Sequence, residues 1–591
     1  MKTTIALDTA GTILDCLNYY ATIQPNAPAY TFVGHRDVER QVLSYGELHE
    51  RANRYAAVLR DDGMSGKNVL LLFPTGLDFI IGFFACAYAG AVAIPANIAR
   101  NSHHYTRLGQ IVENSGAMAV LTAKELKSSI ARGLGNSDSL TFYCEPPVSK
   151  QAYLLAVPPG PERLAFIQYT SGSTGAPKGV MISHGQLIAN ERAIQSVSRL
   201  HEGFTGGGWL PQYHDMGLIG AVLQPIAMGG HYVFMSPLHF LQRPLRWLVL
   251  LSQCKAVATA APNFALELCV QADVDEETAA QLDLSALQII FCGAEPVSAQ
   301  VLERFERKFA HHGLRAGAVT PCYGLAEATL IVSGGLPVDG LRVLNVARKP
   351  LENGLAHTDR KTCLEQQSFV SCGPVVRHHQ VIIVDPDCRT ILDEGQTGEV
   401  WFSGPSVATG YWANEQASTS TFGAMTACGQ GPYMRTGDLG FIRAANLYIA
   451  GRIKELIILR GRNFYPHDIE ATLRNALPSL RDAQTAVFAV DAGESQQVVA
   501  YVEFSRRDKS IGGLDFTSIT REFRAAVLAV HDIRLVDIVY LYQGALPRTS
   551  SGKVQRHLCA SRYIDQSIEQ HRQLIHSTRL PNSSCLEAIA P

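Results

Sequence analysis

The sequence predicts an α/β protein with largely parallel strands and more than one domain. Apolar blocks of strand length alternate with helical patterns through the first half of the chain, which is typical of α/β layers. The chain has 591 residues, more than one hydrophobic core usually supports. Hydrophobic residues make up 47% and charged residues 18%, so we expect a large core and no extended disorder.

The apolar blocks give the predicted strands in chain order. They lie at residues 69–73, 91–94, 118–121, 164–168, 231–235, 256–260 and 288–291. A helical pattern at about 79–89 leads into the second block. Ser183 and Gln186 have capping-box spacing, which predicts a helix start after the fourth block.

The pattern changes after about residue 375. Strands are predicted at 381–384 and 398–402, and a second boundary falls near 451–454. Beyond it we expect a small α+β unit. Its predicted elements are a helix opened by Pro466 with an apolar face of Ile469, Leu473 and Leu477, a hairpin of 485–490 and 497–504, a helix at 519–530, a strand at 535–541, and a loosely held polar tail from about Asp565.

Charge, cysteine content and apolar runs exclude several classes of protein. A net charge of −2 gives no general field for nucleic acid. The 13 cysteines form no C-x-x-C pair, which indicates reduced thiols rather than zinc ligands. The apolar run 79–96 is interpreted as a buried helix followed by a core strand rather than a membrane span, and the N-terminus lacks a signal-peptide pattern. We therefore expect a soluble, cytoplasmic protein.

Residues 169–180, Tyr-Thr-Ser-Gly-Ser-Thr-Gly-Ala-Pro-Lys-Gly-Val, form the most informative segment. Its glycines permit close approach of a ligand to the backbone, while its hydroxyls and Lys178 suit a polyphosphate. It is not the Walker pattern, because Gly179 follows the lysine. A flexible surface turn is the alternative. The apolar strand before the loop and the helix start after it favour phosphate binding.

Six further motifs follow in order along the chain. Taken singly, each has an ordinary structural explanation, such as a buried histidine or a capped turn. They are Leu-Pro-Gln-Tyr-His-Asp-Met-Gly (210–217), Cys-Gly-Ala-Glu-Pro (292–296), Tyr-Gly-Leu-Ala-Glu (323–327), Arg-Thr-Gly-Asp (435–438), Gly-Arg-Ile-Lys (451–454) and Pro-Arg-Thr-Ser-Ser-Gly-Lys (547–553).

In this order the motifs resemble the adenylate-forming superfamily of acyl-CoA ligases, luciferases and peptide-synthetase adenylation domains. The resemblance runs from about Ile13 to about Arg562. It implies a large N-terminal α/β domain of several subdomains at 1–451, a hinge at 452–455, and a small mobile C-terminal α+β domain with a polar tail at 456–591.

Within this superfamily the chain looks like a fatty acyl-AMP ligase. Segments 70–79 and 209–220 resemble signatures of that subfamily, and Ala326 stands where CoA ligases usually carry Thr. The long connection 329–372 resembles the insertion that these ligases carry, which is thought to hinder the domain arrangement needed for CoA. Long connections of this kind are often functional.

The resemblance implies activation of a fatty acid by ATP and Mg²⁺, with release of pyrophosphate. Lys553, Glu327 and His214 take the catalytic positions, with Lys553 between the carboxylate and the α-phosphate. Glu327 is the expected Mg²⁺ ligand, and Thr170 is a second candidate. Asp438 and Arg452 would hold the ribose and Tyr323 would stack on adenine. The implied nucleotide-binding set is Thr170, Ser171, Gly172, Ser173, Thr174, Gly175, Lys178, Gly293, Ala294, Glu295, Cys322, Tyr323, Gly324, Leu325, Asp438 and Arg452.

The resemblance also implies transfer of the acyl group to the phosphopantetheine thiol of an acyl carrier protein. We expect a separate carrier of polyketide or peptide synthase type, because the chain shows no carrier domain. Lys454 occupies the hinge position. Met216, Ile219 and Phe264 are candidates for the acyl pocket, although core packing explains each equally well.

Two other functions remain open at this level. An ordinary fatty acyl-CoA ligase shares the same ATP-handling residues and differs in its acceptor. A non-catalytic adenylate- or carrier-binding module would have no turnover, although the charged site residues are all present. Chain length, the identity of the carrier and the oligomeric state cannot be inferred from the sequence.

Overall fold

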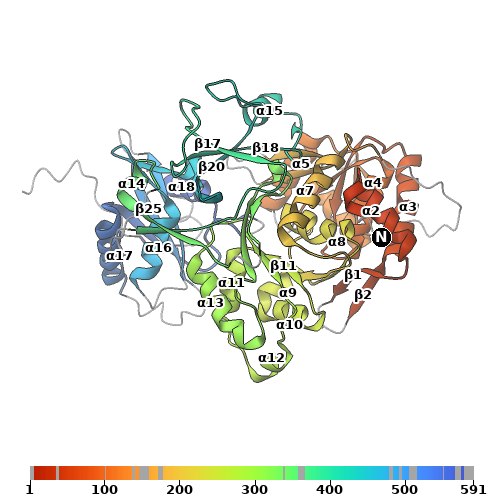
Figure 1. Cartoon of the computed structure of the whole chain (residues 1–591), viewed down its shortest axis with the longest axis horizontal. Coiled ribbons are helices and arrows are strands. Elements are labelled where there is room, and N and C mark those ends of the chain that lie inside the picture. The colour runs from red at the N-terminus through yellow and green to blue at the C-terminus, as the bar shows by residue number, and fades with distance from the viewer. Residues whose placement is uncertain are drawn as a thin grey trace, which may run out of the picture.

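The computed structural model describes residues 6–34, 39–99, 102–135, 140–144, 159–170, 177–336, 340–356, 366–477, 483–491, 496–504, 515–549, 552–565 and 574–577. Two large sheets with flanking helices make up most of the N-terminal part. A smaller sheet with its own helices forms the C-terminal part, coloured blue at the left of Figure 1.

The first large sheet has the strand order β14-β13-β12-β11-β9-β10-β1-β2. The neighbouring strands in the middle of this sheet pair in parallel, and only the two edge pairs, β1–β2 and β13–β14, are antiparallel. The strands are β1 (Pro28–Val33), β2 (Arg40–Ser44), β9 (Thr205–Gly208), β10 (His231–Phe234), β11 (Ala258–Ala261), β12 (Ile289–Cys292), β13 (Val319–Gly324) and β14 (Ile331–Gly334).

The second large sheet has the order β19-β8-β7-β4-β3-β5-β6. Strands β3 to β7 pair in parallel, whereas β8 and β19 add antiparallel at one edge. All seven predicted strands are confirmed between the two sheets. The strands of this sheet are β3 (Asn68–Leu72), β4 (Val92–Pro95), β5 (Ala119–Thr122), β6 (Thr141–Tyr143), β7 (Leu164–Thr170), β8 (Lys178–Ser183) and β19 (Gly410–Tyr411).

Helices cover the faces of both sheets. The predicted capping box is present, with Ser183 accepting from the Gln186 backbone and the Gln186 side chain accepting from the Ser183 N–H. The helices of this part are α1 (Ala6–Thr9), α2 (Ile13–Ile23), α3 (Tyr45–Asp61), α4 (Leu77–Ala89), α5 (Ser102–Ser115), α6 (Lys124–Leu134), α7 (His184–Ser198), α8 (Gln224–Ala227), α9 (Pro237–Gln242), α10 (Leu245–Gln253), α11 (Asn263–Gln271), α12 (Glu276–Gln281) and α13 (Ala299–Phe309).

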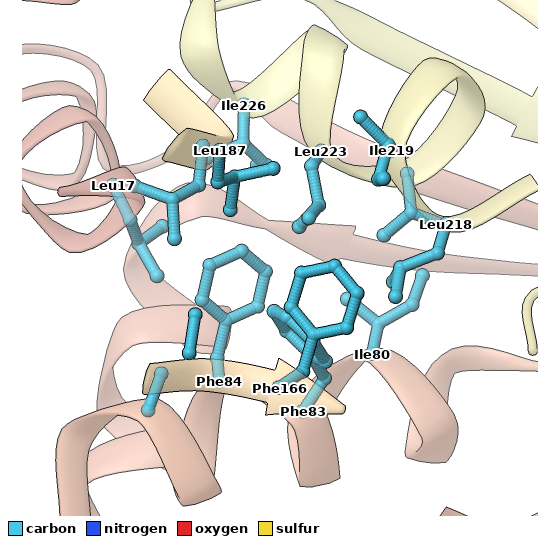
Figure 2. Packing of buried hydrophobic residues seen from close by; sticks show 14 of the residues in the cluster. Leu17, Ile80, Phe83, Phe84, Phe166, Leu187, Leu218, Ile219, Leu223 and Ile226 are labelled. Atoms are coloured by element: carbon cyan, nitrogen blue, oxygen red, sulfur yellow. The ribbon is translucent and has the colours of Figure 1, made fainter. Parts of the chain in front are cut away.

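The main core lies where these early elements meet. Figure 2 shows Phe83 and Phe84 of α4 facing Leu187 of α7 and Leu223, with Phe166 of β7 beside them. The segment Met216–Leu223 is a π-helix, a form that sequence periodicity did not predict. The run 79–96 is the buried helix α4 followed by β4, as predicted. Within the described part of the chain, no helix combines the length and the apolar character needed to cross a membrane.

Two smaller antiparallel sheets follow. One has the order β17-β18-β20-β21 and the other pairs β15 with β16. Their elements are β15 (Val343–Ala347), α14 (Arg348–Glu352), β16 (Gln366–Val370), β17 (Gln380–Val384), β18 (Gly398–Ser403), α15 (Glu415–Phe422), β20 (Met434–Arg443) and β21 (Asn446–Arg452). Asp438 of β20 and Arg452 of β21, two predicted site residues, lie opposite each other in the antiparallel pair of these strands.

The C-terminal unit begins after the short 3-10 helix Ile453–Glu455. Its four-stranded sheet has the order β24-β25-β26-β27, which confirms the predicted hairpin and third strand. Its elements are β22 (Ile457–Leu459), β23 (Arg462–Phe464), α16 (Pro466–Ala476), β24 (Gln484–Asp491), β25 (Gln496–Glu503), α17 (Phe516–His531), β26 (Leu535–Leu541), α18 (Arg556–Ile564) and β27 (Leu574–Ser577).

One expectation for this unit was wrong in part. The polar tail is not loose throughout, because β27 adds to the edge of β26 and the Ser577 hydroxyl donates to Asp537 at 2.8 Å. The predicted apolar face of α16 is confirmed, because Ile469 and Leu473 are buried in one cluster and Leu477, at the C-cap, packs partly buried against it.

The long connection 329–372 contacts the C-terminal unit through α14. Arg462 of β23 makes a two-pronged ion pair with Glu352, at 2.8 and 3.1 Å. Arg348 at the other end of α14 pairs with Asp468 of α16. Figure 1 shows α14 beside the C-terminal elements rather than over the large sheets. Residues 337–339 and 357–365 of the connection lie outside the described residues.

Candidate active site

The predicted site residues gather at the carboxyl ends of parallel strands. Strand β12 ends at Cys292 and leads directly into 293–295, while neighbouring β13 carries 322–324 at its own end. Strand β7 of the second sheet ends at Thr170. In open α/β sheets this edge is where ligands bind, because loops from several strands meet there.

Asp438 lies at the centre of one polar group. The Tyr323 hydroxyl donates to its Oδ2 at 2.6 Å, and Arg452 Nε donates to its Oδ1 at 3.1 Å. Burial, and then the Asp438 charge, raises the pKa of Tyr323 well above its usual value. The Asp438 charge raises the pKa of Arg452. A buried carboxylate with fixed partners can accept from vicinal hydroxyl groups such as those of a ribose.

A second buried carboxylate supports the loop that carries Asp438. Glu399 is 2% exposed on its side chain and pairs with Arg435 at 2.7 Å. It also accepts from Trp401 Nε1 at 2.8 Å and from the Gly437 N–H at 3.1 Å. Because three donors from two strands meet on this carboxylate, the turn before Asp438 is held firmly.

Two glycines permit backbone approaches that no side chain would allow. A Cβ on Gly293 would lie 2.7 Å from the Cys322 carbonyl oxygen, and one on Gly324 would lie 1.9 Å from that of Leu330. Next to the first, Ala294 has φ of +69°, a conformation that L residues seldom adopt. The first approach packs the 293–295 loop directly on the end of β13, and the second closes the turn after β13, where the Leu325 N–H donates to the Leu330 carbonyl at 2.9 Å.

Only the ends of the predicted phosphate loop are described. Thr170 lies opposite Lys178 in the β7–β8 pair. Ser171, Gly172, Ser173, Thr174 and Gly175 lie outside the described residues. Lys178 Nζ lies 4.9 Å from the centroid of the Tyr411 ring, a cation–π distance. The register brings both ends of the loop to the same edge of the sheet.

Glu327 is the carboxylate predicted to hold a metal. Its Oε1 accepts from the Tyr411 hydroxyl at 2.8 Å, and burial raises its pKa. Among the described residues no cluster of three or more His, Cys, Asp or Glu could hold a metal ion. The partly buried Glu327 carboxylate is a hard oxygen donor. It fits Mg²⁺, which usually takes one or two carboxylates and completes its shell with water and phosphate.

His214 lies at the N-terminal end of the π-helix beside Asp215. The two side chains meet at 2.6 Å, and Asp215 also accepts from the Met216 N–H at 2.6 Å. Burial opposes ionisation of Asp215, but the adjacent His214, with Lys553, lowers its pKa to about 2. The site therefore holds a carboxylate anion that fixes the orientation of the predicted catalytic histidine.

Lys553 reaches this site from the C-terminal unit. Its loop is closed by mutual contacts with Thr549, whose N–H donates to the Lys553 carbonyl at 2.8 Å. A Cβ on the preceding Gly552 would lie 3.4 Å from the Phe264 ring, so the loop packs on the N-terminal domain. Burial lowers the pKa of Lys553, and the nearby charge of Asp215 opposes that decrease.

A third carboxylate lies beneath the lysine loop. Glu295 accepts from the Phe264 N–H at 2.6 Å, which ties the turn after β12 to the start of α11. Burial raises the pKa of Glu295, while the charges of Lys553 and Arg548 oppose that rise. The lysine is thus within electrostatic range of carboxylates from two different strand ends.

The acyl-pocket candidates lie in different surroundings. Phe264 is partly buried beside Trp209, with ring centroids 6.2 Å apart, and faces the lysine loop. Met216 is buried in the same cluster, whereas Ile219 belongs to the main core in Figure 2. Phe264 lies against the lysine loop and Met216 directly follows Asp215, so these two candidates lie beside proposed site residues, whereas Ile219 lies in the main core.

Sequence reasoning missed three contributors. Tyr411 contacts both Glu327 and Lys178, Asp215 orients His214, and Glu399 supports the Asp438 turn. Asp215 could have been inferred from its position next to His214. The other two act on residues distant in the sequence, so no local pattern indicates them.

Three features define an enzyme of the adenylate-forming class. They are the loops at the strand ends, the buried carboxylate of Asp438, which suits a ribose, and Lys553, which comes from the C-terminal unit. The family model for AMP-binding enzymes matches residues 17–412, and that for the AMP domain of Disco-interacting protein 2-like proteins matches 454–573. AMP-binding enzymes of this class use ATP.

Comparison with similar proteins shows to which family within the adenylate-forming class the chain belongs. The chain is 36% identical to the medium-chain-fatty-acid–[acyl-carrier-protein] ligase JamA of Moorena producens, over 95% of this chain and 96% of that protein. It is 34% identical to the long-chain-fatty-acid–AMP ligase FadD26 of Mycobacterium marinum, over 93% and 96%. A crystal structure of the fatty acid AMP ligase from Legionella pneumophila covers 98% of this chain and 99% of its own, with a TM-score of 0.74 and 32% identity. The chain belongs to the fatty acyl-AMP ligase family.

Proposed function

We propose that this enzyme activates a fatty acid with ATP and passes the acyl group to a carrier protein. The first step forms an acyl-adenylate and releases pyrophosphate. The second forms a thioester with the phosphopantetheine thiol of a separate acyl carrier protein and releases AMP. The relatives named for fatty-acid–AMP and acyl-carrier-protein ligase activity support both steps.

The observation that carries the proposal is the position of Lys553. It extends from the C-terminal unit into a site lined by N-terminal carboxylates, with Gly552 packed on Phe264. Attack of a carboxylate on the α-phosphate joins two anions, so a cation between them stabilises the transition state. A lysine supplied by the second domain meets this need only while the domains are closed in this way.

Each of the other residues then has a defined role. Asp438 accepts from the ribose hydroxyls, with Arg452 and Tyr323 fixing its orientation. Lys178 holds the phosphates that leave, and Glu327 is the ligand proposed for Mg²⁺. When bound, Mg²⁺ would neutralise charge on the phosphate oxygens. His214, oriented by Asp215, lies next to the π-helix and contacts the incoming carboxylate.

The second step requires a different arrangement of the domains. Lys454, in the short 3-10 helix Ile453–Glu455, is the proposed hinge, and 1–451 and 456–591 are the parts that move. Two ion pairs, Arg348–Asp468 and Arg462–Glu352, join the connection 329–372 to the C-terminal unit. They favour the present arrangement and support a carrier-bound thiol over free CoA as the acceptor.

Three finer points belong to this proposal. The carrier is of polyketide or peptide synthase type, the enzyme acts in the cytoplasm, and Phe264 with Met216 and Ile219 contributes to the acyl pocket. That pocket would set the chain length of the fatty acid, and the fatty-acid panel described below would show which lengths are accepted.

The test of the first step is pyrophosphate–ATP exchange with a panel of fatty acids and Mg²⁺. Exchange that depends on a fatty acid, together with acyl-AMP detected by mass spectrometry, is the expected result. Absence of exchange with every carboxylic acid would indicate a binding module without turnover.

A further inference from the structure

Tyr411 lies between two parts of the site that are far apart in the sequence. It belongs to β19, which pairs antiparallel with β8, and it lies opposite Val180. The Trp412 N–H donates to the Gly179 carbonyl at 2.7 Å, and the Thr409 N–H donates to Met181 at 3.0 Å. This pairing fixes Tyr411 against the strand that begins at Lys178.

The side chain of Tyr411 contacts both proposed phosphate-handling charges. Its hydroxyl donates to Glu327 Oε1 at 2.8 Å, and its ring centroid lies 4.9 Å from Lys178 Nζ. The backbone of the same segment is tied to the carboxylate as well, because the Ala408 N–H donates to the Glu327 carbonyl at 2.9 Å. One short segment therefore holds the main chain and the side chain of Glu327.

Tyr411 is itself held from behind by α15. Its N–H donates to Ser418 Oγ at 2.8 Å, and its ring meets Phe422 edge-on at 5.2 Å. Tyr411 as a whole residue is 6% exposed. A ring fixed on three sides loses little further entropy when it orients a neighbour, which suits it to a positioning role.

We propose that Tyr411 is a positioning residue that sets the spacing and orientation of Lys178 and Glu327 for Mg²⁺-bound triphosphate. The hydroxyl fixes the plane of the Glu327 carboxylate, and the ring fixes the ammonium group. This inference rests on the proposed function for the identity of the ligand. It adds a residue that touches neither the metal nor the phosphates but acts through the two that do.

The two contacts can be removed separately. Tyr411→Phe keeps the ring and removes the hydroxyl, so it should raise the Mg²⁺ concentration needed for half-maximal ATP binding about tenfold. Tyr411→Leu removes the ring as well and should also weaken ATP binding by about threefold when Mg²⁺ is absent. Tyr433→Phe is the matched control, because Tyr433 donates to Gln380 at 3.2 Å in a neighbouring sheet.

The measurement is calorimetric titration of ATP into the full-length enzyme over a series of Mg²⁺ concentrations, without fatty acid. Its outcome does not depend on the acid, so it is separate from the exchange assay that tests the proposed function. A Mg²⁺ dependence of Tyr411→Phe within twofold of the wild type would overturn the inference.

A double-mutant cycle distinguishes positioning from a general structural effect. On a Glu327→Gln background, Tyr411→Phe should change the Mg²⁺ dependence by less than twofold, because its partner is already lost. A full tenfold effect on that background would contradict action through Glu327. If Tyr411→Phe does not fold, Phe422→Leu loosens the same ring and should raise the Mg²⁺ requirement about twofold; an unchanged requirement would overturn the inference.

Discussion

At the scale of single residues, the charged side chains of this site affect one another strongly because they are buried close together. Lys553 has no acidic partner in its own loop, and the carboxylates near it come from the N-terminal domain. Burial lowers its pKa, so the charged form depends on those carboxylates. A ligand phosphate and a fatty-acid carboxylate would add to the same stabilisation.

Removal of this one charge should separate catalysis from binding. Lys553→Ala is expected to slow pyrophosphate release by roughly 10²- to 10³-fold, because the lost interaction forms with the transition state. ATP affinity measured by calorimetry should change by less than about threefold, since most nucleotide contacts come from the N-terminal domain. Lys255→Ala, a change at an exposed lysine, is the matched control. Near-normal pyrophosphate release by Lys553→Ala would exclude the proposed role.

The residues that the sequence predicted are those whose motifs are local. Asp438, Glu327 and Lys553 each lie within a short run of distinctive residues, and the order of these runs carries the family resemblance from which their roles were expected. Tyr411 was missed because its partner Glu327 lies 84 positions away. Its aromatic ring in a Gly-Tyr-Trp run has many structural explanations, and only the β8–β19 pairing shows which of them applies.

At the scale of elements, helix α14 links the connection 329–372 to the C-terminal unit. Both of its ends carry an ion pair across the interface, and the Glu352–Arg462 pair uses both carboxylate oxygens. Such two-pronged pairs are geometrically specific as well as attractive. In the proposed second step the C-terminal unit turns about Lys454, and this link would then have to break or slide first.

Breaking these two pairs should make CoA a better acceptor. The double variant Arg348→Gln/Glu352→Gln is expected to keep fatty-acid adenylation and to increase acyl-CoA formation about tenfold, since two partly buried pairs together are worth about 1–2 kcal/mol. Glu267→Gln breaks the remote Arg304–Glu267 pair and serves as the control. Product analysis by mass spectrometry that finds acyl-CoA formation unchanged would show that the ion pairs do not restrict the acceptor.

The buried His531 on α17 should make the free energy of unfolding depend on pH. Burial, with the charge of Arg348, lowers the pKa of His531 from 6.5 to about 3. The folded state therefore binds fewer protons than the unfolded state between these values, so stability falls as the pH drops below 6.5. The contribution of this group reaches about 3 kcal/mol near pH 4.

His531→Gln should flatten that dependence. Urea unfolding of the full-length protein, followed at pH 7 and pH 4, is expected to show a smaller loss of unfolding free energy in the variant than in the wild type. His201→Gln, at an exposed position, should behave as the wild type does. Equal losses in His531→Gln and the wild type would mean that this histidine does not carry the effect.

Elements were predictable where burial gives a periodic or continuous pattern. The buried parallel strands appear in the sequence as unbroken apolar blocks. The start of α7 is marked by the capping-box residues Ser183 and Gln186. The π-helix Met216–Leu223 was missed because it is apolar on every side and shows no distinctive period. Strand β27 was missed because a four-residue edge strand exists only through its pairing with β26.

At the scale of the whole molecule, the arrangement of the domains brings Lys553 to the site formed by the strand ends. The two large sheets bring the strand ends together, and the C-terminal unit closes over them with Lys553. This arrangement suits adenylation, in which the lysine must reach the α-phosphate. In the proposed thiol step the C-terminal unit moves, and the ion pairs of α14 would oppose that movement.

The most direct test offers both acceptors to the enzyme at once. A fatty-acid panel with ATP and Mg²⁺ is incubated with CoA and with phosphopantetheinylated carrier proteins, and all products are identified by mass spectrometry. We predict acyl-AMP with release of pyrophosphate, acylated carrier protein, and little or no acyl-CoA. Rapid formation of acyl-CoA in the presence of carrier protein would contradict the central claim.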